Sequence, residues 1–185
     1  MEDGRIVELF WKRSELALEE TAKKYGKYCY SIAFNILGNP EDADESVNDT
    51  YLGAWKSMPP HRPAVLSTFL GKITRRISLN RWRYQNRKKR GHGEVPLAME
   101  ELSWCLPSGE NPEETVVMQE LVRGIDCFLS QLPDTERDVF MCRYWFFAPI
   151  REIGERFGFT ESKTKSILYR VRIKLKEYLR KEGYL

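Results

Sequence analysis

The feature of this 185-residue sequence that most restricts its fold is the recurrence of apolar residues at helical spacing along most of its length. An apolar residue every three or four positions gives a helix one buried stripe, whereas a half-buried strand needs strict alternation, and no segment shows it convincingly. The recurrence is clearest in three sets: Cys29, Ile32 and Ile36; Val47, Tyr51, Ala54 and Met58; and Val117, Leu121, Ile125 and Leu129. We therefore predict an all-α protein.

The helical pattern is interrupted between residues 91 and 112, where three glycines and three prolines fall in an acidic stretch without a clear period. Glycine and proline in such number end helices and favour turns. We predict two small helical domains, residues 1–90 and 113–185, joined by a flexible acidic linker, residues 91–112.

Charge is strongly segregated along the chain, although 30 Lys and Arg against 27 Asp and Glu leave a formal net charge of only +3. Residues 71–90 contain nine basic side chains and no acid, and residues 92–122 contain seven acids and no Lys or Arg. Residues 160–185 contain eight basic side chains against three acids. Blocks of one sign are typical of segments that bind a charged partner, so we expect several interfaces rather than one.

Several classes of protein are excluded by what the sequence lacks. No apolar run approaches the roughly 20 residues that cross a bilayer, and the first residues lack the layout of a secretory signal. The four cysteines form no CxxC pair, there are only two histidines, and the common catalytic motifs are missing. We expect a cytoplasmic protein with reduced thiols, no membrane insertion, no metal, no cofactor and no catalytic residues.

Residues 39–58 are predicted to form a helix with an apolar stripe and a separate acidic face. Asn39 and Pro40 suit the N-cap and the first turn of a helix. The expected buried stripe consists of Ala43, Val47, Tyr51, Ala54, Trp55 and Met58. A different face carries Asp42, Glu45, Asn48, Asp49 and Leu52.

The basic block at residues 71–90 continues a helix that starts near Ser67 and packs inward through Leu70, Ile73 and Ile77. Trp82 and Tyr84 lie among its cations, and rings beside cations suit unpaired bases and their phosphates. Arg76, Asn80 and Arg83 form one stripe that could follow a strand. Two alternatives to nucleic-acid binding stay open. The basic residues could simply form a solvated surface, and Trp82 could pack in the core.

Residues 149–181 match the layout of a helix-turn-helix. A short helix ends at Gly158, and Thr160 suits the N-cap of a longer basic helix, whose first turns would enter the major groove of DNA. Gly154 would permit close approach of the two helices. The exposed candidates for DNA contact are Ser162, Lys163, Lys165, Ser166, Tyr169 and Arg170. A solvated basic face on a packing helix is the alternative.

Several blocks of the sequence resemble the bacterial RNA polymerase sigma factors, specifically the small two-domain extracytoplasmic-function type. EDADESVNDTYLGAW at residues 41–55 is similar to the family's acidic helix, and FLGKITRR at residues 69–76 to its promoter-melting helix. Four further blocks resemble the family's C-terminal helix-turn-helix domain: LPDTER at 132–137, RY at 143–144, IREIG at 150–154 and KSILYRVR at 165–172. The likeness covers about residues 10–90 and 113–180.

The resemblance implies a non-enzymatic sigma factor that binds core RNA polymerase, recognises −10 and −35 promoter elements and helps to melt DNA. Docking on the clamp helices of the polymerase's largest subunit would use Glu45, Asn48, Asp49 and Leu52. The single-stranded −10 element, with one flipped base, would contact His61, Arg62, Lys72, Arg75, Arg76, Asn80 and Arg83. The −35 duplex would contact Ser162, Lys163, Lys165, Ser166, Tyr169 and Arg170.

Further partners follow from the same resemblance: the C-terminal domain would rest on the polymerase flap, and an anti-sigma factor is a common partner in the family. The chain departs from the family pattern at Arg76 and Asn80, where Asn and Asp are frequent, so the −10 preference is not transferred. Thr160-Glu161-Ser162 replaces a Pro-x-Gly turn and Ile167 a frequent Arg, so individual −35 base contacts are not transferred either.

Two alternative functions stay open. A free-standing helix-turn-helix regulator would bind duplex operators alone, often as a dimer on a palindrome, but would leave the acidic helix without a use. A metal-dependent hydrolase could hold Mg²⁺ through Asp42, Asp44, Glu45 and Asp49, although no partner histidine is evident. The acidic linker has two open roles: imitation of nucleic acid in the polymerase's RNA exit path, or extension of a tether.

Overall fold

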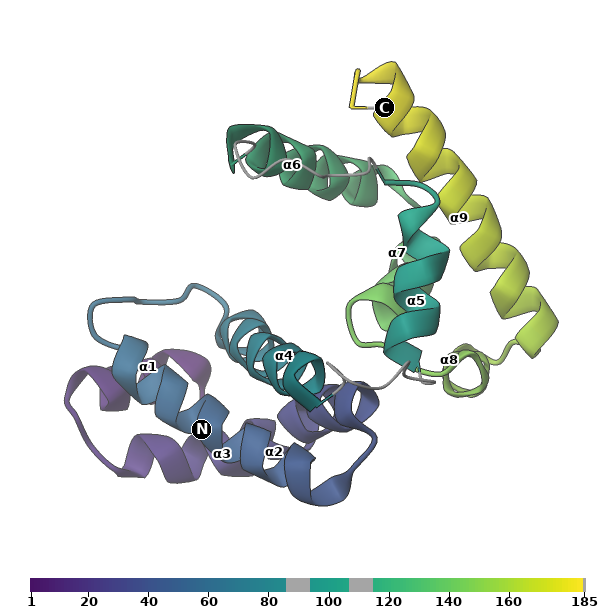
Figure 1. Ribbon diagram of the computed structural model, residues 1–185. Helices are drawn as coiled ribbons and strands as arrows, with labels where there is room; N and C mark the ends of the chain where they lie inside the picture. The colour runs from purple at the N-terminus through teal and green to yellow at the C-terminus, as the bar shows by residue number, and fades with distance from the viewer. Residues whose placement is uncertain (86–93, 107–114, 185) are drawn as a thin grey trace. The chain divides into compact units, whose positions relative to one another are not determined.

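The computed structural model describes residues 1–85, 94–106 and 115–184, and every regular element within these ranges is a helix (Figure 1). Side chains of residues 115–119 lie outside the description. The chain divides into two compact units, Met1–Gly91 and His92–Leu185. The predicted all-α fold is confirmed for the described residues.

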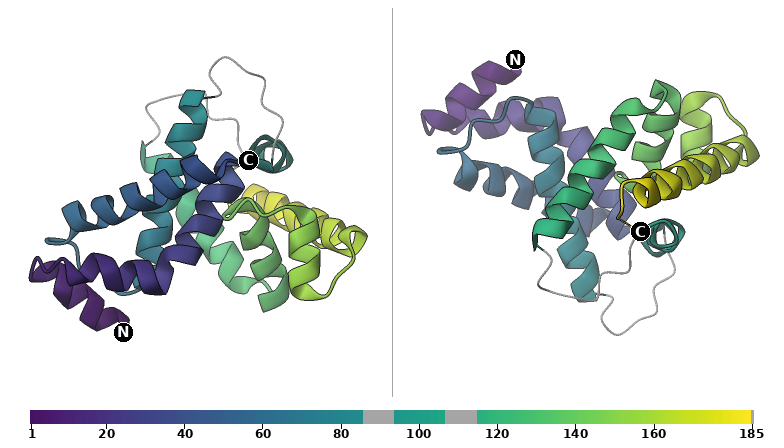
Figure 2. Two further views of the ribbon diagram at one scale, coloured as in Figure 1. Left: turned by 90° about the horizontal axis from the view of Figure 1, so that it is seen from below. Right: turned by 90° about the horizontal axis from the view of Figure 1, so that it is seen from above.

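The described part of the N-terminal unit is built from four helices: α1 (Asp3–Trp11), α2 (Leu16–Leu37), α3 (Pro40–Ser57) and α4 (Leu66–Gln85). Helices α2, α3 and α4 pack against one another, and α1 packs against α2 (Figure 2). Apolar side chains from all four helices form one core, which includes Phe10, Ala17, Cys29, Ala33, Ala43, Ala54, Met58, Leu70 and Ile73. The helical stripes predicted from the sequence are therefore the surfaces that build this core.

The start of α3 confirms the predicted cap. Gly38 ends α2 in the left-handed region, with a φ of 67°, and the Asn39 side chain then accepts a hydrogen bond of 3.0 Å from the backbone N–H of Asp42. Pro40 occupies the first turn, where a missing N–H costs nothing. The short Gly-Asn-Pro connection fixes where α3 begins and therefore which of its residues face the core.

The register between α3 and α4 is fixed by close packing. The Thr50 and Thr74 hydroxyl oxygens lie 3.1 Å apart, and both side chains are fully buried. Each hydroxyl also lies within hydrogen-bond distance of a carbonyl of its own helix, that of Ser46 at 2.7 Å and that of Leu70 at 2.9 Å. A Cβ on Gly53 would lie 3.0 Å from a methyl group of Ile73, so a larger residue there would push the helices apart. This contact holds the acidic helix directly beside the basic one.

The described part of the C-terminal unit contains α5 (Glu94–Ser103), α6 (Thr115–Gln131), α7 (Asp134–Tyr144), α8 (Ile150–Phe157) and α9 (Glu161–Lys181). Gly158 adopts a φ of 67° between α8 and α9, and Thr160 accepts a hydrogen bond of 3.2 Å from the Lys163 N–H. A Cβ on Gly154 would lie 2.7 Å from the Phe159 carbonyl oxygen. The helix-turn-helix is present, and Gly154 is needed for the turn itself.

The segment 91–112, which the sequence analysis interprets as a flexible linker, contains a helix in its described part. Residues 94–103 form α5, and Val95, Ala98 and Cys105 are buried within the C-terminal unit. The reason is an arginine: Arg143 of α7 is only 1% exposed, and a buried guanidinium requires anions beside it. Glu94 and Glu101 supply them.

Glu101 is the centre of a network that ties α5 to α7 and α9. Its carboxylate forms an ion pair with Arg143 at 2.8 Å, accepts a hydrogen bond from the Tyr144 hydroxyl at 2.9 Å, and lies 3.3 Å from Arg172. Burial of the Glu101 carboxyl disfavours its charge, but the bonds and charge of Arg143 outweigh burial and lower its pKa. Two of the acidic residues in the segment 91–112, Glu94 and Glu101, therefore stabilise the fold.

Glu101→Gln should lower the free energy of unfolding by about 1–3 kcal/mol, because it leaves Arg143 with one carboxylate fewer in a buried place. Since the pKa of Glu101 is lowered in the folded protein, its contribution is complete above the ordinary value of 4.5 and disappears as the pH falls through the folded pKa. Urea denaturation at several pH values measures this. Glu100→Gln, exposed on the same helix, is the control; equal stability of both variants at pH 7 would contradict the network's role.

Candidate protein and nucleic-acid interfaces

The acidic face of α3, which we define as Glu45, Asn48, Asp49 and Leu52, lies on the side of the helix away from the core. The side chain of Glu45 is 66% exposed and that of Asp49 47% exposed. Asn48 and Leu52 are also exposed, while Val47 and Thr50 between them are buried. The four side chains predicted for docking are thus available on one helix surface.

A groove of about 600 Å³ adjoins this face between α2 and α3. Asn48, Tyr51, Leu52 and Trp55 line it from α3, and Glu15, Leu18 and Glu19 line it from the start of α2. The sequence analysis missed the contribution of α2. The sequence shows that Glu15, Leu18 and Glu19 share one helix face, because they are spaced by three and four residues. It does not show that this face lies beside α3.

Arg81 of α4 lies against the other edge of the acidic face. Its guanidinium nitrogens are 2.5 Å from Glu45, 3.3 Å from Asp42 and 3.4 Å from Asp49. The hydrogen bond and charge of Arg81 lower the pKa of Glu45. The sequence analysis counted Arg81 only as one cation of the basic block.

The basic stripe of α4, which we define as Arg76, Asn80 and Arg83, is exposed along the helix. Lys72 is exposed one turn earlier, and Arg75 is partly buried, where desolvation lowers its pKa. The two aromatic residues of the block differ: Tyr84 is 74% exposed, whereas Trp82 is half-buried. Tyr84 is therefore the more accessible stacking surface.

The loop before α4 is held by α1. Arg62 forms an ion pair with Glu8 and lies over the Trp11 ring at 5.4 Å, and the Trp11 indole N–H donates to the His61 carbonyl at 3.3 Å. His61 and Arg62 remain exposed. These contacts position the loop that carries His61 and Arg62, two of the residues predicted to contact the −10 strand, and the sequence analysis did not foresee them.

The six candidates for DNA contact on α9 share one exposed face. Ser162, Lys163, Lys165, Ser166, Tyr169 and Arg170 are all exposed, whereas Thr164, Ile167, Leu168 and Val171 are buried. A shallow groove of about 410 Å³ runs between Ser162, Lys165, Ser166 and Tyr169. Lys163 also lies over the Phe159 ring at 3.9 Å.

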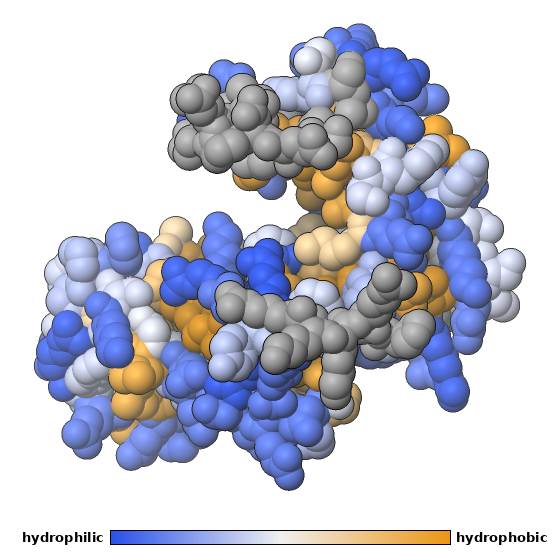
Figure 3. Space-filling model, in the orientation of Figure 1, coloured by the Kyte–Doolittle hydropathy of each residue, from blue (hydrophilic) through white to orange (hydrophobic). Residues whose placement is uncertain are grey.

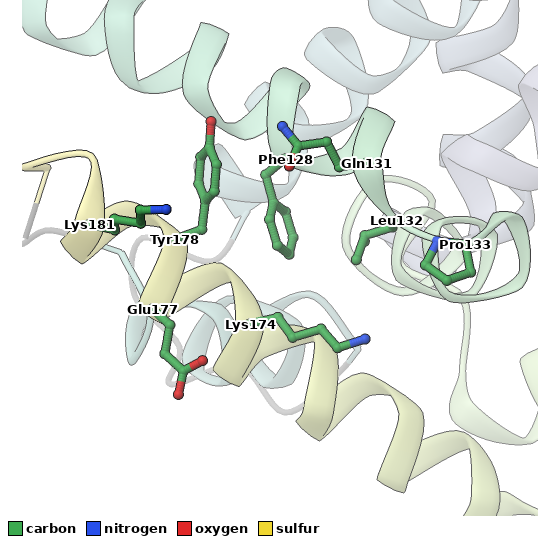
Figure 4. Close-up of a pocket in the computed structure, with 8 residues that line it drawn as sticks. All are labelled: Phe128, Gln131, Leu132, Pro133, Lys174, Glu177, Tyr178 and Lys181. Carbon is green, nitrogen blue, oxygen red and sulfur yellow. The ribbon is translucent and has the colours of Figure 1, made fainter.

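A second groove of the C-terminal unit, of about 390 Å³, lies between α6 and α9 (Figure 4). Phe128 and Tyr178 place their rings 5.5 Å apart at its centre, and Leu132 and Pro133 continue the apolar lining. Lys174, Glu177 and Lys181 form its charged border. This groove is separate from the exposed candidates at the start of α9.

On the face of the N-terminal unit that Figure 3 shows, hydrophilic side chains predominate and apolar patches lie between them. Within the described residues, no helix combines the length and apolar character needed to span a membrane, and no group of three or more His, Cys, Asp or Glu side chains could hold a metal. Asp42, Glu45 and Asp49, proposed as Mg²⁺ ligands in one alternative, instead surround the guanidinium of Arg81.

Comparison with known proteins matches both units to regions of one protein family. Residues 21–88 match the model for sigma-70 region 2, and residues 128–177 match the model for sigma-70 region 4. The chain is 24% identical over 166 residues to the ECF RNA polymerase sigma factor SigE of Mycolicibacterium smegmatis, covering 89% of this chain and 62% of SigE. It is 25% identical over 174 residues to the ECF RNA polymerase sigma factor SigW of Bacillus subtilis, covering 91% of this chain and 92% of SigW.

The two matched regions, in this order, define a two-domain helical protein of transcription initiation. The chain belongs to the sigma-70 family of RNA polymerase sigma factors, within its extracytoplasmic-function group. It spans less than two thirds of the length of SigE and nearly all of SigW. Helices α1 and α5 lie outside both matched regions, so their contacts are features of this chain that the comparison does not describe.

Proposed function

We propose that this protein binds core RNA polymerase in the cytoplasm and directs transcription from promoters with a −10 and a −35 element, without catalytic activity of its own. The observation that carries the proposal is the juxtaposition of opposite charges in one unit: the acidic face lies on α3, and the basic stripe lies on the adjacent α4. A protein partner and a nucleic-acid strand can thus be held by neighbouring helices.

The acidic face and the groove beside it suit a cationic helical surface with apolar side chains. Glu45 and Asp49 supply charge that steers association, and Leu52, Tyr51 and Trp55 supply apolar area that stabilises the complex. In this family the matching partner is the pair of clamp helices of the largest subunit. Glu15, Leu18 and Glu19 extend the proposed docking surface onto α2.

The basic stripe suits the unpaired −10 strand. Arg76 and Arg83 can neutralise phosphates, Asn80 can hydrogen-bond to bases, and the exposed Tyr84 ring can stack on one. Flipping a base from the stack costs a few kcal/mol, so the free protein should open duplex DNA poorly and melting should require the polymerase. His61 and Arg62, held by α1, would line the pocket for the flipped base.

The exposed face of α9 suits the major groove of the −35 element. Lys163, Lys165 and Arg170 can contact phosphates, and Ser162, Ser166 and Tyr169 can reach base edges. The apolar groove between α6 and α9 is free for a protein partner while α9 holds DNA, and the polymerase flap is our candidate. An anti-sigma factor would act by covering these same surfaces.

Asp49→Lys should weaken binding to core polymerase by about tenfold or more, because it sets a cation against a cationic partner. The fold should survive, since the residue lies outside the apolar stripe. Fluorescence anisotropy with labelled full-length protein measures the affinity. Asp126→Lys, the same charge reversal on exposed surface of α6, should bind like wild type; an unchanged affinity of Asp49→Lys would remove the acidic face from the docking site.

Arg83→Ala should leave core binding unchanged and reduce open-complex formation, because the lost contact is to DNA. If that contact is to a phosphate, the slope of log K against log salt should be shallower by roughly 0.7. Permanganate reactivity of unpaired thymines measures melting. Lys27→Ala, which removes one exposed cation from α2, is the matched control, and normal melting by Arg83→Ala would exclude the basic stripe as the strand path.

A further inference from the structure

Helix α1 contacts the loop between α3 and α4 through two side chains, Glu8 and Trp11, which are three residues apart and share one face of the helix. Glu8 forms an ion pair with Arg62, and the centre of the Trp11 ring lies 5.4 Å from the same guanidinium. The Trp11 indole N–H also donates to the His61 carbonyl at 3.3 Å. Three contacts from one helix therefore act on two adjacent loop residues.

Other interactions hold this part of the loop less firmly. His61, Arg62 and Ala64 are exposed, so burial of apolar surface does little to fix them. The His61 N–H donates to the Ser57 carbonyl at 3.1 Å, which ties the start of the loop to α3 but does not orient its side chains. A pocket of about 290 Å³, lined among others by Ala64 and by Val7 of α1, shows that the loop is not closely packed on the helix there. The polar contacts of α1 therefore decide where these side chains lie.

Helix α1 is itself fixed to the core and can serve as a rigid support. Ile6 and Phe10 are fully buried, and Phe10 meets Trp55 edge-on with ring centres 6.2 Å apart. Just after α1, the Arg13 guanidinium donates to the Trp55 carbonyl at 2.7 Å. Because Trp55 belongs to the last turn of α3, these contacts fix α1 close to the point where the loop begins.

We propose that Glu8 and Trp11 are positioning residues, which hold His61 and Arg62 in the arrangement that selects a base of the −10 element. This inference rests on the proposed function, in which the two loop residues contact the −10 strand. A loop held in one arrangement binds the matching base without an ordering cost and cannot rearrange to suit another base. Helix α1 lies outside the residues matched to sigma-70 region 2, so this role goes beyond the family comparison.

The ion pair also reduces the charge that the loop presents to DNA. Without Glu8, the Arg62 guanidinium would attract any phosphate more strongly, whatever base it carries. Loss of the Glu8 charge should therefore raise the general attraction of the loop for single-stranded DNA and lower its selectivity. A merely structural role of α1 predicts weaker binding to every strand instead, so the two roles are distinguishable.

Trp11→Leu should lower selectivity at one −10 position roughly threefold to tenfold, which is the cost of ordering one or two side chains. Holoenzyme assembled from core polymerase and the full-length variant would be mixed with promoter fragments randomised in the −10 element, and fragments captured in open complexes would be sequenced. Selectivity is the ratio of fragments with the preferred base to fragments with the other three. Trp11→Phe, which keeps a ring beside Arg62 but lacks the indole N–H, should lose less. Trp104→Leu, the same change at an exposed tryptophan of the C-terminal unit, should keep wild-type selectivity.

Glu8→Gln tests the same inference through charge, and its side chain is 47% exposed, so the fold should survive. Its selectivity should fall roughly threefold while its capture of fragments with other bases rises. This variant carries the test alone if Trp11→Leu does not fold. Affinity for core polymerase, measured by fluorescence anisotropy, should equal that of wild type for every variant.

Unchanged selectivity of Trp11→Leu and Glu8→Gln would overturn the inference. An equal loss of capture at every base would also overturn it, because that pattern indicates a loosened fold. In both cases wild-type holoenzyme would still form open complexes at selected fragments, and the proposed function would stand. Wild-type protein that forms no open complexes with core polymerase would overturn the proposed function and this inference with it.

Discussion

The packing of α3 against α4 decides where the two proposed interfaces of the N-terminal unit lie relative to each other. The buried contact between the Thr50 and Thr74 hydroxyls and the close approach of Gly53 to Ile73 mark the register in which these helices pack. In that register Arg81 falls opposite Glu45 and Asp49, while Arg76, Asn80 and Arg83 stay exposed on α4. A shift by one helical turn would separate the charges, so the arrangement of both proposed interfaces follows from packing in the core.

Local features of the structure were predictable because each depends on residues close in the sequence. The Asn39 cap, the left-handed Gly158 and the Thr160 cap need only a few neighbouring residues, and all three are present. The separation of exposed and buried faces on α3 and α9 follows from the helical period in the same way. The family resemblance was also available from the sequence, because its motifs are short blocks in a fixed order.

The contacts that the sequence analysis missed join residues far apart in the chain. Glu101 and Arg143 are 42 residues apart, and the acidic composition around Glu101 resembles that of a solvated linker until the buried arginine is known. Arg81 and Glu45 are 36 residues apart, and each appears in the sequence as one charge among many. Pairing of this kind depends on the tertiary fold, which periodicity does not specify. Charge segregation thus indicated surfaces, but not which charges neutralise one another inside the protein.

The near-neutral total charge is therefore the sum of folded ion pairs and of separate charged surfaces. Among the acidic side chains, Glu94 and Glu101 hold α5 to the C-terminal unit, Asp42 faces Arg81, and Glu45 and Asp49 contact Arg81 but stay largely exposed on α3. A free-standing regulator would need the basic face of α9 alone, whereas the acidic face, its groove and the exposed stripe of α4 suit a subunit that binds protein and DNA together. The proposal of a promoter-specificity subunit is the one that uses all of these surfaces.

Reconstituted transcription tests this account most directly. Core RNA polymerase, the full-length protein and a library of promoter fragments would be combined, and transcript start sites would be mapped by sequencing. We predict start sites that depend on the added protein and share two upstream elements at a fixed spacing. Transcription that is unchanged by the protein, together with tight and symmetric binding of duplex DNA in the absence of polymerase, would contradict the account and favour a free-standing regulator.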